Sequence, residues 1–316
     1  MRACGAVVDF SSVTADPIGL RCVTFNVRGP ANPDWDRRSR VIGSALRALE
    51  ADVVALQEVN VRGGVEDLLG PGYCITPFSA TSEDDTGAAL ATRAKHRVLE
   101  EIDQRTPEHR EDLPWCATLI VELESALGPL VVAHHKPNWP FPLESEREQQ
   151  ARRAALAVEK HAGDRPAVVL GDFDATPDSA SMLFWRGRRS IDGVSVCYQD
   201  AWETARPTDP GLTFTAENPL VRAGEVATAV SRRIDYVLVR AGRHGALLQV
   251  MHCERLLDGP VDSVWASDHY GVIADLSLPE HPPGRWTSGF RAQVRRAATT
   301  INPAGSPIPD SFCRRA

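Results

Sequence analysis

The sequence lacks an apolar run of the about 18 residues that a membrane-spanning helix needs. Its first residues also lack the apolar core of a secretory signal. The seven cysteines occur singly, with no C-x-x-C pair, which fits reduced thiols and disfavours a zinc site. These absences predict a cytoplasmic protein with no membrane span, and no segment points to a protein partner.

Positive charge is not in excess. The chain has 35 Lys and Arg against 42 Asp and Glu, a formal net charge of -7. A protein that follows a nucleic-acid backbone usually presents an excess of positive charge, although a local basic patch can occur on an acidic protein. A nucleic-acid partner is therefore disfavoured but stays possible.

Hydrophobic residues make up 43% of the 316 residues, which is ample for a buried core. We expect three parts: a leader at 1–19, one catalytic domain at 20–280, and an Arg-rich tail at 281–316. The tail has no compact apolar pattern apart from a possible short helix at 288–298. There is no internal repeat and no low-complexity tract.

Within residues 20–280, β-branched apolar runs alternate with patterns that are apolar on one helical face. The strands predicted are 20–27, 52–56, 73–78, 88–91, 98–102, 115–123, 129–133, 168–170, 233–239, 246–254 and 272–276, and the helices are 35–50, 65–69 and 144–161. The polar stretch 106–113 is expected to be an exposed loop.

The apolar run at 168–170 ends abruptly in Gly171-Asp172-Phe173-Asp174. In α/β proteins, ligands gather outside the carboxyl ends of strands, so Asp172 and Asp174 are candidates for handling a metal or a water. The competing interpretation is that an Asp of this loop only caps a helix that begins near Pro177. We expect that capping role for Asp178.

Other predicted strand ends carry the same kind of polar group. The set is Asn26, Glu58, His134 or His135, Asp172, Asp174, Asp235, Asp268 and His269. Oxygen ligands without thiolate suit a hard cation such as Mg²⁺, with Mn²⁺ as a possible substitute. The chemistry indicated is hydrolysis of a phosphoester, which needs a cation to neutralise charge, a group that orients water, and donors around the phosphate oxygens.

Five short motifs occur in a fixed order along the chain. They are Thr24-Phe25-Asn26-Val27-Arg28, Leu56-Gln57-Glu58-Val59, Gly171-Asp172-Phe173-Asp174, Arg233-Ile234-Asp235-Tyr236 and Ser267-Asp268-His269. Together they resemble the endonuclease/exonuclease/phosphatase (DNase I-like) superfamily. The resemblance covers about residues 20–278. It implies an α/β fold, a four-layer sandwich of two mostly antiparallel central sheets flanked by helices, with one metal-assisted site.

The resemblance also implies roles for individual residues. Glu58 would be the main Mg²⁺ ligand, Asp268 would support the metal side, and Asn26 would position metal or phosphate. A turn-forming role before Gly29-Pro30 is the alternative for Asn26. Asp172 would orient or deprotonate the attacking water. His269 would face the scissile phosphate, held by Asp235, which fixes its tautomer and favours its protonated form.

Further positions are predicted to meet the substrate. Successive strand residues face opposite ways, so only one of His134 and His135 can enter the site, and the family pattern favours His135 as the catalytic one. Arg147 and Gln150 match a recurrent Arg-x-x-Gln, or else form a solvated helix face. The loops 137–143, which contains Asn138, and 218–230 are expected to shape the substrate pocket. Asp200 is interpreted as structural.

Asp174 departs from the family pattern, which usually has an Asn that donates a hydrogen bond. An ionised Asp donates nothing and adds negative charge beside an anionic substrate. Either a cation offsets this charge, or one of Asp172 and Asp174 holds a proton, or the substrate differs from the usual ones.

The function predicted is a metal-dependent phosphodiesterase or phosphatase acting on a small-molecule or lipid-like phosphate. The first alternative is a nuclease of the same superfamily, for which the Arg-rich tail and Arg186, Arg188 and Arg189 would supply positive charge. The second is a binding protein that kept the fold and lost catalysis, disfavoured because the expected acids and His269 are all present.

Overall fold

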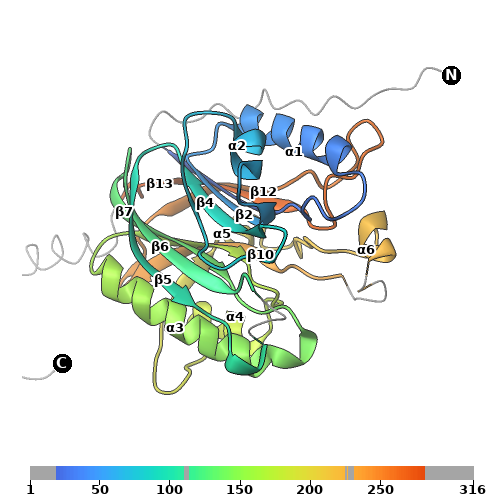
Figure 1. Ribbon diagram of the computed structural model, residues 1–316. Helices are drawn as coiled ribbons and strands as arrows, with labels where there is room; N and C mark the ends of the chain where they lie inside the picture. The colour runs from blue at the N-terminus through green and yellow to red at the C-terminus, as the bar shows by residue number, and fades with distance from the viewer. Residues whose placement is uncertain (1–18, 110–113, 225, 227–230, 282–316) are drawn as a thin grey trace, which may run out of the picture.

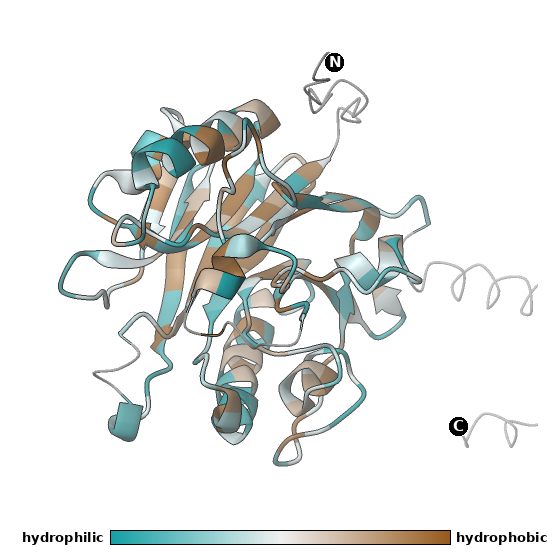
Figure 2. Ribbon diagram, turned by 90° about the vertical axis from the view of Figure 1, so that its right-hand side faces the viewer, coloured by the Kyte–Doolittle hydropathy of each residue, from teal (hydrophilic) through white to brown (hydrophobic). Residues whose placement is uncertain are grey.

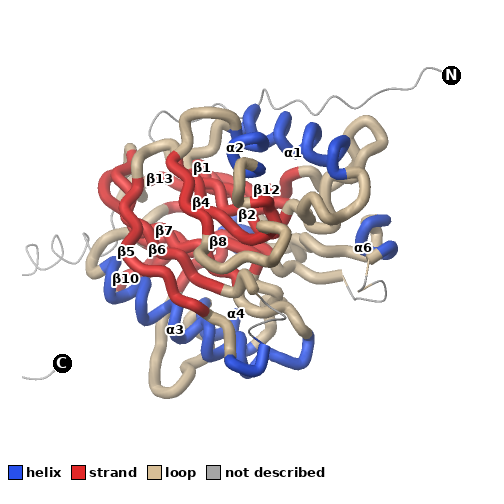
Figure 3. Tube along the Cα trace, in the orientation of Figure 1, coloured by secondary structure: helices blue, strands red, loops and turns tan. Residues whose placement is uncertain are grey.

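The computed structural model describes residues 19–109, 114–224, 226 and 231–281. Two β-sheets form the centre, and helices cover their outer faces (Figures 1 and 3). The predicted four-layer α/β sandwich is therefore confirmed. The expected leader and Arg-rich tail lie outside the described residues, apart from Gly19 and His281, as does the possible helix at 288–298.

The first sheet joins the N-terminal strands to the last strand of the domain. Its order is β12 (Gln249–Leu256), β13 (Gly271–Ser277), β1 (Leu20–Asn26), β2 (Val53–Asn60), β4 (Thr86–Thr92) and β3 (Cys74–Pro77). Only β1 and β2 are parallel, and the other pairs are antiparallel.

The second sheet contains the central part of the chain. Its order is β11 (Gly245–Ala246), β10 (Asp235–Gly242), β8 (Ala167–Asp172), β7 (Gly128–Lys136), β6 (Ala117–Ser125) and β5 (His96–Asp103), with β9 (Tyr198–Asp200) paired to β10. Here only β7 and β8 are parallel. Both sheets are thus mostly antiparallel, as the family resemblance implied.

Apolar side chains hold the layers together. Strand residues such as Val132, Leu170 and Val237 form the core between the sheets, and Figure 2 shows hydrophobic residues concentrated on these strands. Helices α1 (Trp35–Leu49) and α2 (Gly64–Leu69) cover the first sheet. Helices α3 (Glu144–Ala162) and α4 (Ala180–Trp185) cover the second.

Helix α1 illustrates how the sequence specifies this packing. Ile42, Leu46 and Leu49 are spaced three or four residues apart, so they lie on one helical face. That face is buried against Val23 and Leu56 of the first sheet. Each fully buried side chain of this size contributes about 1.5–3 kcal/mol to the free energy of unfolding.

The remaining helices are short. They are α5 (Ala201–Ala205), α6 (Pro219–Ala223) and the 3₁₀ turns Pro107–His109 and Phe141–Leu143. No helix in the described part of the chain is both long and apolar enough to cross a membrane.

Two local predictions were wrong. The second strand does not stop at Gln57-Glu58 but continues to Asn60, because a β-bulge at Glu58 interrupts its pairing with β4 without ending it. Helix α4 begins at Ala180, and its cap is Ser179, whose hydroxyl accepts from the backbone N–H of Met182. Asp178 instead accepts a hydrogen bond from the Thr176 hydroxyl.

Candidate active site

The site lies at one edge of the sandwich, where strand ends from both sheets meet. β1 and β2 end there in the first sheet, and β7 and β8 end there in the second, while β10 and β13 begin there because they run antiparallel to these strands. The register of β8 and β10 puts Asp172 directly opposite Asp235. Asn26 joins the two sheets, since its Nδ2 donates to Asp172 Oδ2 at 3.1 Å.

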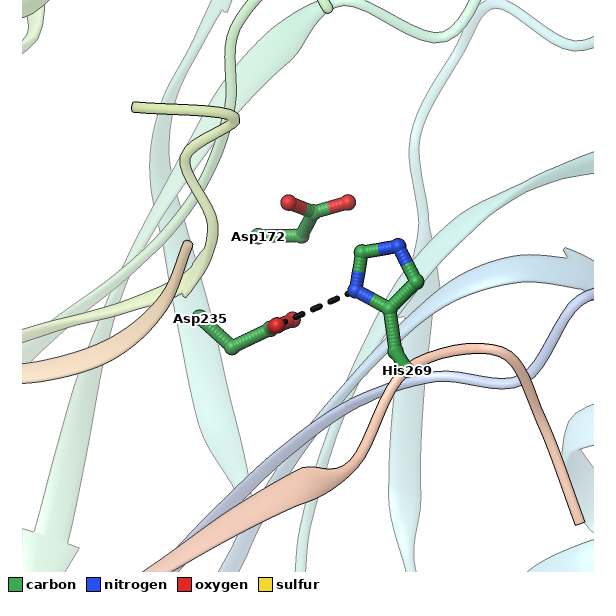
Figure 4. Close-up of side chains that lie close together, drawn as sticks. All are labelled: Asp172, Asp235 and His269. Atoms are coloured by element: carbon green, nitrogen blue, oxygen red, sulfur yellow. Dashed lines mark hydrogen bonds and ion pairs between the residues drawn. The ribbon is translucent and has the colours of Figure 1, made fainter. Parts of the chain in front are cut away.

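Asp235 and His269 form a buried carboxylate–imidazole pair. His269 Nδ1 donates to Asp235 Oδ2 at 3.0 Å, and the other ring nitrogen points away from Asp235 (Figure 4). Burial acts against a charged imidazole, but the carboxylates of Asp235 and Asp172 outweigh it and raise the pKa of His269 to about 10. The imidazole is therefore a cation at neutral pH, with one N–H free to face a ligand.

Lys136 places a second cation in the site. Its Nζ donates to Asp172 Oδ2 at 2.8 Å and also to Asp174 Oδ2. The Lys136 side chain is only 3% exposed, and the two carboxylates outweigh burial and raise its pKa. Of the possibilities for Asp174, the structure shows the first, an offsetting cation, and this cation is an ammonium of the protein.

The two carboxylates held by Lys136 differ in proton affinity. Burial opposes ionisation of Asp172, yet Lys136 and His269 outweigh it and lower its pKa to about 2. Burial and the negative charge of Asp172 raise the pKa of Asp174 to about 6. Asp172 is thus firmly ionised at neutral pH, whereas Asp174 is close to its titration range.

Glu58 and Asp268 form the acidic side of the site. The bulge turns the backbone of Glu58 to a positive φ of 53°, and its Oε1 accepts from Asn26 Nδ2 at 2.9 Å. Burial and the charge of Asp268 raise the pKa of Glu58. Asp268 Oδ2 is 3.2 Å from Arg28 Nη1. Two neighbouring carboxylates and the amide oxygen of Asn26 are donors that fit a hard cation, which would relieve their repulsion.

A second group also has ligand-type atoms close together. One such atom from each of Asp172, Asp235 and His269 lies within 4.8 Å of the others. His269 is paired through Nδ1 with Asp235, and as an imidazolium it would have no lone pair to offer a metal. We therefore interpret this group as a charge-paired cluster, of which Asp172 and His269 line the cavity.

Most of these groups open onto one cavity of about 730 Å³. Its polar wall consists of Asn26, Arg28, Asn32, Glu58, Lys136, Asp172, Asp174, Arg232, Asp268 and His269. Its apolar wall consists of Trp115, Trp139, Phe141, Phe214, Val221, Ala223, Gly224, Val226 and Ile234. Both loops expected to shape the pocket, 137–143 and 218–230, thus contribute residues to it.

Neither His134 nor His135 lines this cavity. His134 points between the sheets, where its Nε2 is 2.7 Å from Gln57 Nε2. His135 points toward the helical layer, where its Nδ1 is 2.7 Å from the Thr118 hydroxyl and its ring packs against Phe173. Burial lowers the pKa of both to about 3, so both are neutral. The expectation that His135 enters the site is wrong, and so is a substrate contact by His134.

Arg147, Gln150 and Asn138 also lie outside the cavity. Arg147 Nη1 donates to the carbonyl oxygen of Pro140 at 2.8 Å, and Gln150 Oε1 accepts from the Asn138 backbone N–H at 3.2 Å. Asn138 Nδ2 donates to Glu146 Oε2 at 2.9 Å. These buried side chains hold the 137–143 loop against α3, so the prediction of direct substrate contact does not fit their positions. The solvated helix face is equally wrong, since Arg147 and Gln150 are buried.

Asp200 has the structural role that was predicted. Its Oδ1 accepts from the Trp202 backbone N–H at the start of α5, and its Oδ2 accepts from Arg233 Nη1 at 2.6 Å. Both Asp200 and Arg233 are buried. Arg233, which belongs to the fourth motif, therefore links the start of β10 to the start of α5.

The sequence was compared with family models and with proteins of known structure. Residues 23–269 match the model described as the Endonuclease/Exonuclease/phosphatase family. The chain belongs to this family. No curated protein matches the sequence.

Solved structures of endonuclease/exonuclease/phosphatase proteins share the fold over most of the chain. D. rerio TDP2 complexed with a single-strand DNA product has 19% identity and a TM-score of 0.64, covering 82% of this chain and 99% of that one. A family member from Bacteroides vulgatus has 22% identity and a TM-score of 0.61, covering 83% and 99%. The human Nocturnin catalytic domain with bound sulfate has 20% identity and a TM-score of 0.59, covering 83% and 94%.

The family motifs did not reveal Lys136, Trp115 or Arg232 as cavity residues. One signal could have found Lys136. Residues two apart in a strand share a face, so Lys136 lies on the same face of β7 as His134, and Asp172 lies on the same face of β8 as Leu170. Lys136 and Asp172 are the last residues of their strands, so on that face their side chains reach the edge of the sheets, where they meet.

Proposed function

We propose that this protein is a Mg²⁺-dependent phosphoesterase that cleaves a phosphodiester or phosphomonoester bond of a small-molecule or lipid-like phosphate. The observation that carries the proposal is the buried Asp235–His269 pair, whose imidazole lines the same cavity as Asp172, Lys136 and Glu58. Anionic and cationic groups line this one cavity together. A phosphate ester needs both, since its oxygens require donors and its attacking water requires an acceptor.

Glu58, Asp268 and the amide oxygen of Asn26 are the residues that would hold Mg²⁺. When bound, the ion would neutralise charge on the phosphate and favour attack by water. Mn²⁺ is a plausible substitute because it accepts the same oxygen ligands.

The protein's own groups complete the site. The imidazolium of His269 would donate its free N–H to a non-bridging phosphate oxygen, and Asp235 would keep the ring protonated and oriented. Asp172 is a weak base because its pKa is about 2. It would accept a hydrogen bond from the attacking water and orient it, rather than hold its proton.

Lys136 would bind a second non-bridging oxygen. An ammonium has three N–H donors, and Asp172 and Asp174 accept two of them. No third acceptor occurs among the described residues, while the side chain lines the cavity. Lys136 would thus replace the donor that the family's usual Asn supplies, and Asp174 would serve as the counter-ion that holds it in place.

The second candidate is a nuclease, favoured by the aromatic and Arg residues of the cavity wall, which could stack and pair with a nucleotide. The related D. rerio TDP2 structure holds a single-strand DNA product. The net charge of -7 argues for weak binding of long DNA. Tight binding of a single-stranded oligonucleotide, weakening steeply as salt rises, would favour the nuclease instead.

The primary experiment tests whether activity needs a divalent cation and the carboxylate of Glu58. Phosphodiester and phosphomonoester substrates are assayed with Mg²⁺, with Mn²⁺ and with EDTA, in the wild type and in Glu58→Gln. A neutral amide is a poor ligand for a hard cation, so the variant should lose activity by a factor of about 10² or more. Glu66→Gln, an exposed change on α2, is the matched control. Full activity in EDTA would exclude a metal-dependent mechanism, and no activity on any ester would favour a binding protein.

A further inference from the structure

Arg232 is a cation of the cavity that has no anionic partner among the described residues. Its guanidinium carbon lies 4.3 Å from the ring centre of Phe141 and 5.4 Å from that of Phe214. Its Nε is buried and has no hydrogen-bond partner, and none of the described carboxylates forms an ion pair with its side chain. Stacking fixes the plane of the guanidinium and leaves its N–H donors unused.

Phe214 links this guanidinium to the catalytic imidazole. Its backbone pairs with Arg232 on one side and with His269 on the other. Because neighbouring strands are about 4.8 Å apart, the backbones of Arg232 and His269 are separated by about 10 Å. The Phe214 ring is also 5.1 Å from the His269 ring. One aromatic ring therefore lies between two cations that line the same cavity.

An aromatic surface with Arg232 at one end and His269 at the other fits an elongated, doubly anionic ligand. Phe141 is 50% exposed and Trp139 is 40% exposed, so the apolar wall is available for contact. A buried donor without a partner is unfavourable, and a phosphate oxygen would satisfy it. A phosphate on Arg232 would leave a second phosphate within reach of His269, with the connecting group lying on the rings.

We infer that Arg232 binds a second phosphate group of the substrate, separated from the scissile phosphate by a spacer that lies against the rings of Phe141 and Phe214. This inference rests on the phosphoesterase function proposed above and narrows its substrate class to bisphosphorylated molecules. Such a ligand could be a nucleotide with phosphates at both ends or a small bisphosphate of another kind. Both present the same chemistry to Arg232.

Binding of matched ligands tests the inference without relying on turnover. Calorimetry compares thymidine 3′,5′-bisphosphate with thymidine 5′-monophosphate, and a hexose bisphosphate with its monophosphate. In the wild type, the second phosphate should tighten binding at least about tenfold in one or both pairs. Arg232→Gln should abolish this gain and leave the monophosphate affinities unchanged. Arg232→Lys, which keeps the charge but not the planar fork, should retain part of it.

Arg222→Gln is the matched control, because it removes one charge next to the cavity from a side chain whose hydrogen bonds to described residues go to the carbonyl oxygens of Ala216 and Glu217. It should keep the full preference. A gain in the nucleotide pair alone identifies a nucleotide ligand, and a gain in the hexose pair alone identifies a small bisphosphate. Equal affinity for mono- and bisphosphates in the wild type overturns the inference, as does an equal loss of both in Arg232→Gln. Retained preference without turnover of any ester would instead count against the proposed function alone.

Discussion

The effects of substituting Lys136 and Asp174 on the free energy of unfolding should be coupled. Removing the Asp174 carboxylate should restore part of the stability that is lost when the Lys136 ammonium is removed. Lys136→Met leaves Asp172 and Asp174 as two buried carboxylates without their cation, and breaking a buried ion pair in this way costs about 3–5 kcal/mol. Asp174→Asn should cost little, because folding raises the pKa of Asp174 to about 6 and thus disfavours its ionised form. Asn also tolerates the left-handed backbone at this position, where φ is 52°.

The double variant Lys136→Met/Asp174→Asn should therefore be more stable than Lys136→Met alone. It has lost both a cation and the anion that repels Asp172, so the net charge of the group is the same as in the wild type. We expect the second substitution to recover about 1–3 kcal/mol of the free energy of unfolding. Asp172 would keep its hydrogen bond from Asn26 Nδ2.

Urea unfolding followed by fluorescence measures all four proteins at about pH 8, where Asp174 is ionised in the wild type. EDTA is present because a divalent cation could replace the lost ammonium. The control cycle uses Lys160 and Glu100, an exposed pair 3.3 Å apart, whose coupling should stay below about 1 kcal/mol. A double variant that is no more stable than Lys136→Met would refute the proposed charge arrangement.

Three further outcomes are expected. Asp235→Asn should move the alkaline limb of the kcat profile to lower pH, because this carboxylate has the largest effect of the groups that raise the pKa of His269 to about 10 against the effect of burial; a limb that does not move would show that this carboxylate does not hold the proton there. Asp200→Asn should lower the free energy of unfolding by about 3–5 kcal/mol, since it breaks the buried pair with Arg233, and KM should not change, a point that steady-state kinetics can check. Asp174→Asn should leave the Mg²⁺ concentration for half-maximal activity unaltered, because the cation beside that carboxylate is an ammonium; a metal titration that shifts would assign Asp174 to the ion instead.

The layers were predicted correctly from the sequence, and most residues that line the candidate site were found there, because both depend on local signals. A β-branched apolar run predicted β1, and an apolar pattern of helical period predicted α1. Short ordered motifs marked Glu58, Asp235 and His269 as candidates, and the structure brings them to one edge of the sheets. The predictions that failed concern features that are set by contacts between distant segments of the chain. The bulge at Glu58 is set by pairing with β4.

The choice between His134 and His135 failed for the same reason. The strand runs one residue further, so that Lys136 and not either histidine lies at the edge of the sheet. Arg147 and Gln150 form a motif whose partners, the 137–143 loop and Gln104, can be identified only in three dimensions. Arg232 belongs to no motif, and only its stacking on Phe141 and Phe214 reveals it.

The strand order has a consequence for the protein during its synthesis. β1 lies between β2 and β13, and the residues just before β13 supply Asp268 and His269. A nascent chain that has emerged only as far as β10 has Asn26, Glu58, Asp172 and Asp235. It still lacks Asp268 and His269. Nearly the whole domain must therefore leave the ribosome before the candidate site is complete, so a chain truncated before residue 268 should lack any activity that depends on this site.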